Sequence, residues 1–473
     1  MFTVNVILEA LTGSFNPNAT AMINGAAIDS RQVYPKNIFI AIPGEQVDGH
    51  DFVADAFRRG ASCAIIQRDS PLPFPVLDLR NGVLPEEFDY SQIPFCIRVE
   101  NSLNALQKIA AFWRQQLNLR VIGITGSVGK STTKELVAEV LSQRFHTLKN
   151  PGNMNNEIGL PLTILQLTKE HSHAVLEMGF YVPGEIAFLC EIAKPQIGVI
   201  TNIGTVHAER AGSQADIARG KSELVQHLPA GPEGVAILNY DDPWVRGMAE
   251  KTNASVFTYG LDPEADLWAD NVVGMGLEGI RFQLHYKNEV LHVRVPLIGR
   301  HSVHTVLRAT AVGLVEGLTW QEILNGMRES HMQLRLVVVQ TPKKAIILDD
   351  TYNASPESTM AALNLLGDMT GNKIAVLGDM LELGIYEQTG HEMVGNRAAQ
   401  ICNKLFTVGP RAQMIASAAQ KSGMPEENIF TIEDTDHAVE FLRNKFAEGD
   451  VVLIKGSHGL HMEQIVAALE EKE

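Results

Sequence analysis

Apolar segments alternate with helix-length stretches over most of this chain. Four unbroken apolar segments lie in the middle of the sequence, at residues 121–125, 173–177, 196–202 and 235–239. Strands that are apolar at every position and separated by helical stretches are typical of a largely parallel sheet covered on both faces. The pattern therefore predicts a doubly wound α/β unit in the middle of the chain.

The two flanking regions predict further α/β units. Apolar segments at residues 344–349, 373–377, 404–408 and 450–454 are again separated by helix-length stretches, which predicts a second doubly wound unit. The N-terminal region contains shorter apolar segments, 38–42 and 64–66 among them, and ends in a proline-rich stretch at 69–94. This region resembles a small α/β domain.

Helical spacing marks the junctions between these units. Leu103, Leu106, Ile109 and Trp113 predict an amphipathic helix over residues 101–117 that opens the central unit. A helix from Ser302 to about residue 316 leads to the last unit. At 473 residues the chain is long enough for about three domains. We predict a small N-terminal α/β domain (1–98), a central parallel-sheet domain (99–330) and a C-terminal Rossmann-like domain (331–473).

Composition and charge narrow the class of protein. The chain is 45% apolar and 20% charged, as in ordinary globular proteins. Its formal charge of −16 argues against wrapping of nucleic acid or an anionic membrane. The N-terminus has Glu9 within its apolar stretch and no basic segment, which does not fit a signal peptide. Because no run of about 18 apolar residues follows, we expect a cytoplasmic protein without membrane insertion.

The four cysteines give no sign of a metal site. Cys63, Cys96, Cys190 and Cys402 are widely scattered, with no C-x-x-C pair and no histidine at zinc-site spacing. We interpret them as small buried residues in a reducing compartment.

A glycine-rich segment carries the strongest chemical signal. The sequence VIGITGSVGKSTTK (121–134) reads as a buried strand, a tight turn and the start of a helix. Gly126 and Gly129 allow backbone N–H groups to surround a phosphate, and Lys130 adds a positive charge. The hydroxyl of Ser131 would bind Mg²⁺. A strict phosphate loop has glycine where this chain has Ile124, and a glycine-rich turn without a ligand is the alternative interpretation.

This shortened loop resembles the nucleotide loop of the Mur ligases and of their folylpolyglutamate synthetase relatives. Further segments similar to the Mur ligases that add D-alanyl-D-alanine follow in order: NMNNEIGLPL (153–162), EMG (177–179), GEI (184–186), GVITNIGTVH (198–207), GKSE (220–223), DDTYNASP (349–356), LGDMLELG (377–384) and KGS (455–457). The resemblance covers all three regions of the chain. It implies a P-loop-type ATPase fold for the central domain, with ATP and Mg²⁺ as cofactors.

The resemblance also implies four catalytic residues, Lys130, Glu177, His207 and Lys221. Lys130 would neutralise the transferring phosphate, while Ser131, Glu177, His207 and a carbamate on Lys221, formed from CO₂, would bind metal ions. The carbamate is chemically reasonable because a buried amine loses its proton more readily and can then add CO₂. Taken singly, each has a simpler interpretation: a paired surface carboxylate for Glu177, a structural histidine for His207 and a solvated helix lysine for Lys221.

Nucleotide and substrate contacts are implied in the same way. The implied ATP contacts are Thr125, Gly126, Ser127, Val128, Gly129, Lys130, Ser131, Thr132, Arg300, Asp350 and Asn353. The implied substrate contacts are Ser30, Arg31, Gly49, His50, Asn155 and Asn156. Two positions depart from the family pattern: Thr305 stands where asparagine is usual, and His458 stands where arginine is usual. The departure at 305 affects an implied adenine or ribose contact, and the departure at 458 affects an implied carboxylate contact.

The implied reaction joins D-alanyl-D-alanine to UDP-N-acetylmuramoyl-tripeptide through an acyl phosphate, in peptidoglycan precursor synthesis. We expect ADP as product and a monomeric enzyme. The alternative within the family is the ligase that adds the third residue, lysine or diaminopimelate, although the chain has no Asp-Asn-Pro-Arg segment of the kind that reads diaminopimelate. The Asp-Ser-Arg segment at 29–31 argues against a folylpolyglutamate synthetase, in which this segment would have no place. A non-catalytic nucleotide-binding relative is the alternative from another class.

Overall fold

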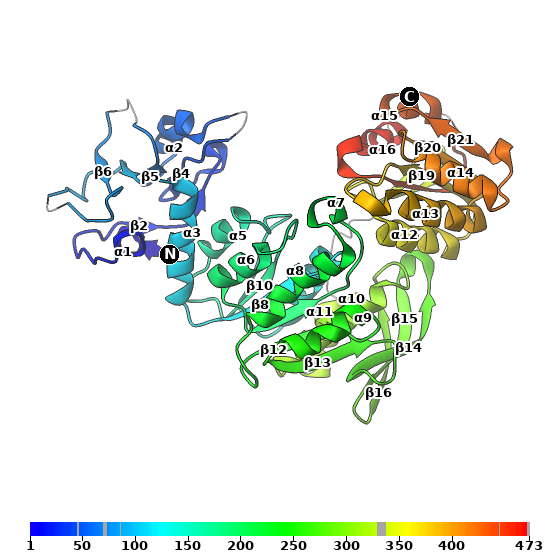
Figure 1. The fold of residues 1–473 in the computed structure, drawn as a ribbon, viewed down its shortest axis with the longest axis horizontal. Helices are drawn as coiled ribbons and strands as arrows, with labels where there is room; N and C mark the ends of the chain where they lie inside the picture. The colour runs from blue at the N-terminus through cyan, green and yellow to red at the C-terminus, as the bar shows by residue number, and fades with distance from the viewer. Residues whose placement is uncertain (45–46, 70–72, 86, 329–336, 444, 471–473) are drawn as a thin grey trace.

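Three units, each built around its own sheet, make up this protein. The computed structural model describes residues 1–44, 47–69, 73–85, 87–328, 337–443 and 445–470. Figure 1 shows the N-terminal unit at one end, the central unit in the middle and the C-terminal unit at the other end. The predicted α/β class with a parallel sheet in each region is confirmed. The boundary predicted between residues 330 and 331 lies outside the described residues.

The N-terminal unit contains a five-stranded parallel sheet. Its strands, in spatial order, are β3 (Ala26–Ala27), β4 (Ile38–Ile40), β5 (Cys63–Ile66), β7 (Phe95–Arg98) and β6 (Val76–Asp78). A short strand pair, β1 (Phe2–Thr3) with β2 (Met22–Ile23), lies beside it. Its helical elements are α1 (Val4–Thr12), η1 (Ser30–Gln32), η2 (Gly49–Phe52) and α2 (Val53–Arg58). Cys63 and Cys96 are fully buried on neighbouring strands, as expected for apolar cysteines.

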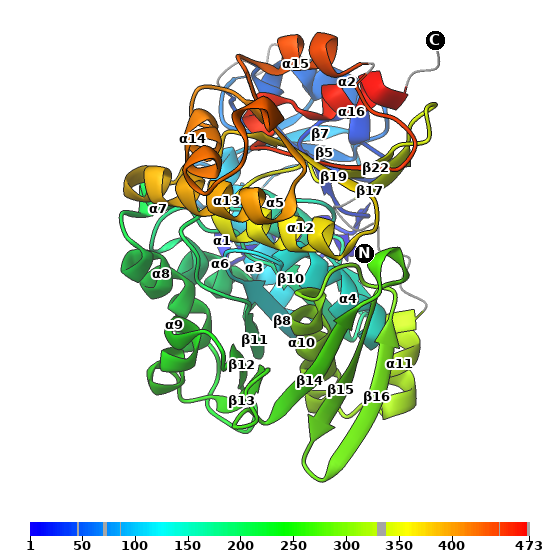
Figure 2. The same ribbon diagram turned by 90° about the vertical axis from the view of Figure 1, so that its right-hand side faces the viewer.

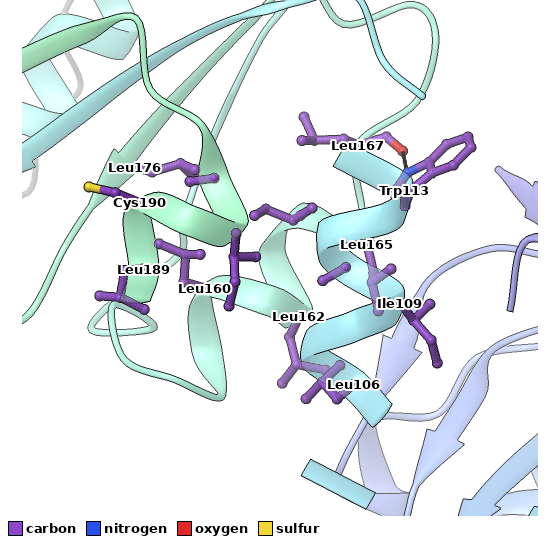
Figure 3. Close-up of a cluster of buried hydrophobic side chains, with 14 of the residues drawn as sticks. Leu106, Ile109, Trp113, Leu160, Leu162, Leu165, Leu167, Leu176, Leu189 and Cys190 are labelled. Atoms are coloured by element: carbon purple, nitrogen blue, oxygen red, sulfur yellow. Dashed lines mark hydrogen bonds between the residues drawn. The ribbon is translucent and has the colours of Figure 1, made fainter. Parts of the chain in front are cut away.

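Helix α3 (Ser102–Gln115) joins the N-terminal unit to the central one. The Asn101 side chain caps it by accepting a hydrogen bond from the Asn104 N–H. Its buried face packs against α5 (Gly159–Ile164) and neighbouring residues, and the Trp113 indole N–H donates to the Leu167 carbonyl at 3.0 Å (Figure 3). One apolar cluster therefore runs across both units.

The central sheet has nine strands, six of them forming a parallel core around the predicted phosphate loop. Their spatial order is β16-β15-β14-β13-β12-β11-β8-β10-β9. The parallel strands are β8 (Arg120–Thr125), β9 (Thr147–Lys149), β10 (His173–Glu177), β11 (Ile197–Ile200), β12 (Val235–Asn239) and β13 (Ser255–Gly260). The remaining strands are β14 (Leu267–Gly274), β15 (Ile280–Tyr286) and β16 (Glu289–Val295), which pair antiparallel with one another and were not predicted.

Helices cover both faces of the central sheet, as Figure 2 shows. They are α4 (Lys130–Ser142), α5, α6 (Glu185–Ala193), α7 (Ala208–Ala211), α8 (Gln214–Gln226), α9 (Pro243–Arg246), α10 (Ser302–Val315) and α11 (Trp320–Arg328). Helix α8 begins at Gln214, because Ser213 and Asp216 form a reciprocal cap at its start.

The C-terminal unit is a six-stranded sheet with helices on both faces. Its strands are, in spatial order, β17 (Val337–Gln340), β18 (Ile346–Asp349), β22 (Asp450–Lys455), β19 (Asn372–Gly378), β20 (Lys404–Val408) and β21 (Ile429–Ile432). Only the edge strand β17 is antiparallel. The covering helices are α12 (Pro356–Asp368), α13 (Glu387–Ile401), α14 (Gln413–Lys421), α15 (Thr435–Leu442) and α16 (Glu463–Glu470). Within the described part of the chain, no helix has the length and apolar character needed to cross a bilayer.

Candidate active site

The loop between β8 and α4 has the backbone of a phosphate-binding turn. Gly126 and Gly129 both have positive φ, at 145° and 83°. A Cβ on Gly126 would lie 1.8 Å from the Thr201 hydroxyl oxygen, so only glycine fits this close approach to β11. The Val128 N–H donates to the Asn202 side chain at 2.9 Å, which ties the loop to the end of the neighbouring strand.

Lys130 curls back over this loop. Its ammonium group donates to the carbonyl oxygens of Gly126 and Ser127, at 2.9 and 3.2 Å. A lysine in this position places one positive charge at the mouth of a ring of backbone groups. The arrangement suits a polyphosphate, which would exchange these carbonyl contacts for its own oxygens.

Ser131 and Glu177 bring two oxygen ligands together beside the loop. The Ser131 hydroxyl donates to the Glu177 carboxylate at 2.6 Å, and the Asn155 amide donates to its other oxygen at 2.9 Å. Glu177 ends strand β10 and is 2% exposed, so it is not a solvated surface carboxylate. Lys134, also buried, lies 4.0 Å away from it and balances its charge.

Lys221 lies beneath the phosphate loop. Its side chain is 1% exposed, its ammonium group donates to the Gly126 carbonyl at 3.0 Å and it lies 4.5 Å from the centre of the Phe180 ring. Burial, and then the positive charge of Lys130, lower the pKa of this amine well below its ordinary value. A solvated helix lysine is therefore the wrong description, and the neutral amine is the form that can add CO₂.

His207 lies at the end of the loop after β11 and immediately precedes α7. Its backbone is left-handed, with φ of 70°. Burial, followed by the charge of Lys130, lowers the pKa of its imidazole to about 4, so the ring is neutral near pH 7. Its Nδ1 lies 2.7 Å from a carboxylate oxygen of Glu382 in the C-terminal unit, which leaves Nε2 with a lone pair.

A loop of the C-terminal unit approaches the same region. Asp350 and Asn353 follow strand β18, and Lys455 ends the neighbouring parallel strand β22. The buried Lys455 ammonium group donates to the Asp350 carboxylate and to the Asn353 carbonyl, each at 2.7 Å. Lys455 therefore fixes the loop, a role that its position at the end of an apolar strand could have suggested.

Most of these groups face one cleft of about 570 Å³ between the central and C-terminal units, whereas Lys221 is not among the residues that line it. It is lined by the loop from Ser127 to Thr132 and by Asn155, Asn156, Glu177, His207, Asp350, Asn353 and Lys455, among others. A neighbouring cavity of about 220 Å³ shares Asn155, Asn156 and Tyr181 and adds the apolar wall of Phe188 and Leu189. Of the predicted nucleotide residues, Ser127 to Thr132, Asp350 and Asn353 line this cleft, whereas Thr125, Gly126 and Arg300 do not.

Arg300 lies apart from the cleft. Its guanidinium forms an ion pair with Asp368 at 3.3 Å, its side chain is 61% exposed, and it is not among the residues that line the cleft. Its neighbours His301, Ser302 and Thr305 do line it, together with Arg308, which the sequence analysis did not single out.

The predicted sugar-nucleotide residues lie in the N-terminal unit and do not line this cleft. Arg31 is exposed and forms an ion pair with Asp29 at 2.8 Å. His50 is buried: its Nδ1 lies 2.6 Å from Asp48, and its Nε2 accepts from the Gln67 N–H at 3.0 Å. Ser30 is also buried, and a Cβ on Gly49 would lie 2.8 Å from the backbone nitrogen of Ile42.

The donor set of the cleft suits Mg²⁺ better than a transition metal. Among the described residues, no three His, Cys, Asp or Glu side chains gather closely enough to form a metal site by themselves. Mg²⁺ needs no such cage, because it usually keeps several waters and binds one or two carboxylates together with substrate phosphates. The adjacent oxygens of Ser131 and Glu177 provide that kind of partial shell.

Comparisons with known proteins agree with this geometry. Three family models match: Mur ligase family, catalytic domain, over residues 22–114; Mur ligase middle domain, over 124–313; and Mur ligase, glutamate ligase domain, over 334–458. The UDP-N-acetylmuramoyl-tripeptide--D-alanyl-D-alanine ligase of Synechocystis is 35% identical and aligns over 99% of this chain and 97% of its own. The Bacillus subtilis ligase of the same name is 34% identical over 99% and 98%.

Solved structures show the same similarity. A crystal structure of MurF from Acinetobacter baumannii is 30% identical, with a TM-score of 0.82, and the match covers 99% of this chain and 98% of that one. The MurF ligase from Thermotoga maritima, crystallised in complex with ADP, is 27% identical, with a TM-score of 0.77 and coverage of 94% and 97%.

Proposed function

This chain belongs to the Mur ligase family, and we propose from that premise that it joins D-alanyl-D-alanine to UDP-N-acetylmuramoyl-tripeptide while converting ATP to ADP and phosphate. The relatives with this activity in their names align with nearly the whole chain at about one-third identity. The product is a UDP-linked pentapeptide precursor of peptidoglycan. We further propose that the enzyme acts in the cytoplasm as a monomer, with all of the proposed site residues coming from a single chain.

The convergence of two units on one cleft carries the proposal. The phosphate loop with Lys130 comes from the central unit, and the loop of Asp350 and Asn353 comes from the C-terminal unit. A ligase of this kind must bring a nucleotide, a carboxylate and an amine together. A cleft between two doubly wound sheets, at the carboxyl ends of their strands, provides a place for all three.

We infer a two-step reaction. A carboxylate oxygen of the tripeptide attacks the γ-phosphorus of ATP, and ADP leaves, which gives an acyl phosphate. The neutral amine of D-alanyl-D-alanine then attacks the acyl carbon, and phosphate leaves as the amide bond forms and the nitrogen loses a proton. Both steps bring anions or developing negative charge together, so the fixed charge of Lys130 near the loop lowers the barrier.

The metal residues have a supporting role in this proposal. Ser131, Glu177, His207 and a carbamate on Lys221 would hold Mg²⁺, which would offset the repulsion between the carboxylate and the γ-phosphate. The carbamate nitrogen keeps one hydrogen, which could still donate to the Gly126 carbonyl now 3.0 Å from the Lys221 amine. The N-terminal unit, with Ser30, Arg31, Gly49 and His50, would hold the UDP-sugar, and Asn155 and Asn156 would contact the peptide.

Phosphate release tests the proposal. With ATP and Mg²⁺, we expect release only when UDP-muramoyl tripeptide and D-alanyl-D-alanine are both present. Release with a UDP-muramoyl dipeptide and lysine or diaminopimelate would instead assign the addition of the third residue. Absence of release with every pair, despite ATP binding, would favour a non-catalytic nucleotide-binding relative.

A further inference from the structure

Arg308 is a buried cation without a carboxylate partner. It lies on helix α10, one turn after Thr305, and its residue is 5% exposed. Among the residues that the structure describes, no carboxylate oxygen lies within 4.0 Å of its guanidinium, and its Nε, fully buried, has no hydrogen-bond acceptor. Burial accordingly lowers the pKa of this guanidinium. An arginine stays charged even so, and a buried charge without a partner is strongly unfavourable.

The contacts that Arg308 does make leave its charge uncompensated. One terminal nitrogen donates to the Thr305 hydroxyl at 2.9 Å, and the guanidinium carbon lies 5.9 Å from the centre of the Tyr259 ring. A neutral hydroxyl and an aromatic ring orient the guanidinium without neutralising it. Arg308 therefore gives this segment of α10 a positive charge that Thr305 does not offset.

The guanidinium points toward the phosphate loop. An ideal Cβ on Gly129 would lie 3.2 and 3.7 Å from the two terminal nitrogens of Arg308. Gly129 precedes Lys130 in the loop and is the N-cap residue of helix α4. Arg308, Thr305 and residues 127–132 of the loop all line the cleft between the central and C-terminal units. The terminal N–H groups therefore lie next to the place where the loop would bind a phosphate chain.

We propose that Arg308 binds the phosphate chain of the nucleotide, as a second fixed cation beside Lys130. The inference rests on the proposed function, because that function puts ATP on the loop. Arginine suits such a position because its planar group donates two parallel hydrogen bonds to phosphate oxygens, and an anion between Lys130 and Arg308 would supply the missing counter-charge.

Competition binding on the full-length protein tests this assignment. Arg308→Met keeps much of the length of the side chain and removes the charge. Arg308→Lys keeps the charge and removes the planar group that donates two parallel hydrogen bonds. We would measure the affinities of ATP, of tripolyphosphate, which has no base or ribose, and of adenosine, which has no phosphate. Arg114→Met is the matched control, since Arg114 is another arginine that is 5% exposed, but it donates to backbone carbonyls away from the cleft.

We expect Arg308→Met to weaken the binding of ATP and of tripolyphosphate by about 10- to 100-fold, because one charge-assisted contact is lost. The affinity for adenosine should change less than about twofold. Arg308→Lys should fall between the wild type and Arg308→Met, and Arg114→Met should bind all three ligands like the wild type. Equal losses for adenosine and ATP, or unchanged affinities in a folded Arg308 variant, would overturn the assignment. Failure of the wild type to bind ATP would instead overturn the proposed function.

Discussion

His207 and Glu382 form a hydrogen bond between the central and C-terminal units: the imidazole Nδ1 lies 2.7 Å from the carboxylate. The backbone carbonyl of Glu382 also accepts from the Glu209 N–H at 3.3 Å, so the same residue docks through its main chain. Glu382 has a left-handed backbone, with φ of 63°, and lies within the LGDMLELG segment (377–384), for which the sequence predicted no chemical role. The bond fixes which nitrogen of His207 remains available to a metal ion.

Glu382→Ala should therefore weaken the metal site from the other unit. We expect the Mg²⁺ concentration for half-maximal activity to rise, or turnover to fall, by about 10-fold, the range for losing the partner of a metal-binding histidine. A magnesium titration at saturating ATP measures this. Glu392→Gln is the control, because Glu392 bonds only to Gln388 on the exposed side of α13. A Glu382→Ala protein with an unchanged magnesium requirement would refute the positioning role.

Lys221 should carry a carbamate when CO₂ is present. We expect wild-type protein in ¹³C-bicarbonate to show a protein-bound carbamate signal by NMR, because its buried amine has a lowered pKa. Lys221→Met should lose that signal and about 100-fold or more in turnover, as when one preorganised stabilising group is removed. Lys108→Met, on the exposed face of α3, is the control and should keep both the carbamate signal and the turnover of the wild type. A wild-type spectrum without the signal would count against the carbamate.

Lys455→Met should destabilise the protein. The Lys455 ammonium group is buried and pairs with Asp350 at 2.7 Å, so its removal leaves a poorly solvated carboxylate. We expect a loss of about 3 to 5 kcal/mol in the free energy of unfolding of the C-terminal unit. Lys344→Met, which breaks an exposed pair with Glu448 at 3.6 Å, should cost less than about 1 kcal/mol. Urea denaturation compares the two, and equal losses would contradict a buried pair.

His391 should make stability fall in acid. Its Nε2 accepts from the Met380 N–H at 3.1 Å, and its Nδ1 lies 2.7 Å from the Glu387 carbonyl, an arrangement that fits only the neutral ring. Burial lowers the pKa of His391 below its ordinary 6.5. The unfolded state therefore binds more protons as pH falls below about 6.5, and stability present above that pH is lost toward the folded-state pKa.

The comparison of wild type with His391→Gln isolates this effect, since glutamine can accept the same Met380 hydrogen bond without titrating. We expect the wild type to lose more unfolding free energy between pH 8 and pH 5 than His391→Gln loses. Parallel pH profiles for the two proteins would show that His391 is not responsible.

The sequence by itself determined the family, the α/β class and the residues around the phosphate loop. Strands such as β10 and β12 were predicted at their observed bounds, because a buried parallel strand is apolar at every position and needs no partner to be recognised. The loop from Gly126 to Ser131 was equally readable, since its glycines and lysine are contiguous in the chain.

Only the tertiary structure decided which distant side chains meet. Lys221 contacts Gly126, Glu382 contacts His207, and Arg308 lies close to Gly129. The two residues of each pair are far apart in the sequence, so local periodicity could not predict these contacts. The antiparallel extension from β14 to β16 escaped prediction for a related reason: its strands are half exposed, so their apolar residues alternate with polar ones. Strand pairing, register and the burial of charged side chains depend on how whole sheets pack, so they are decided only in the folded protein.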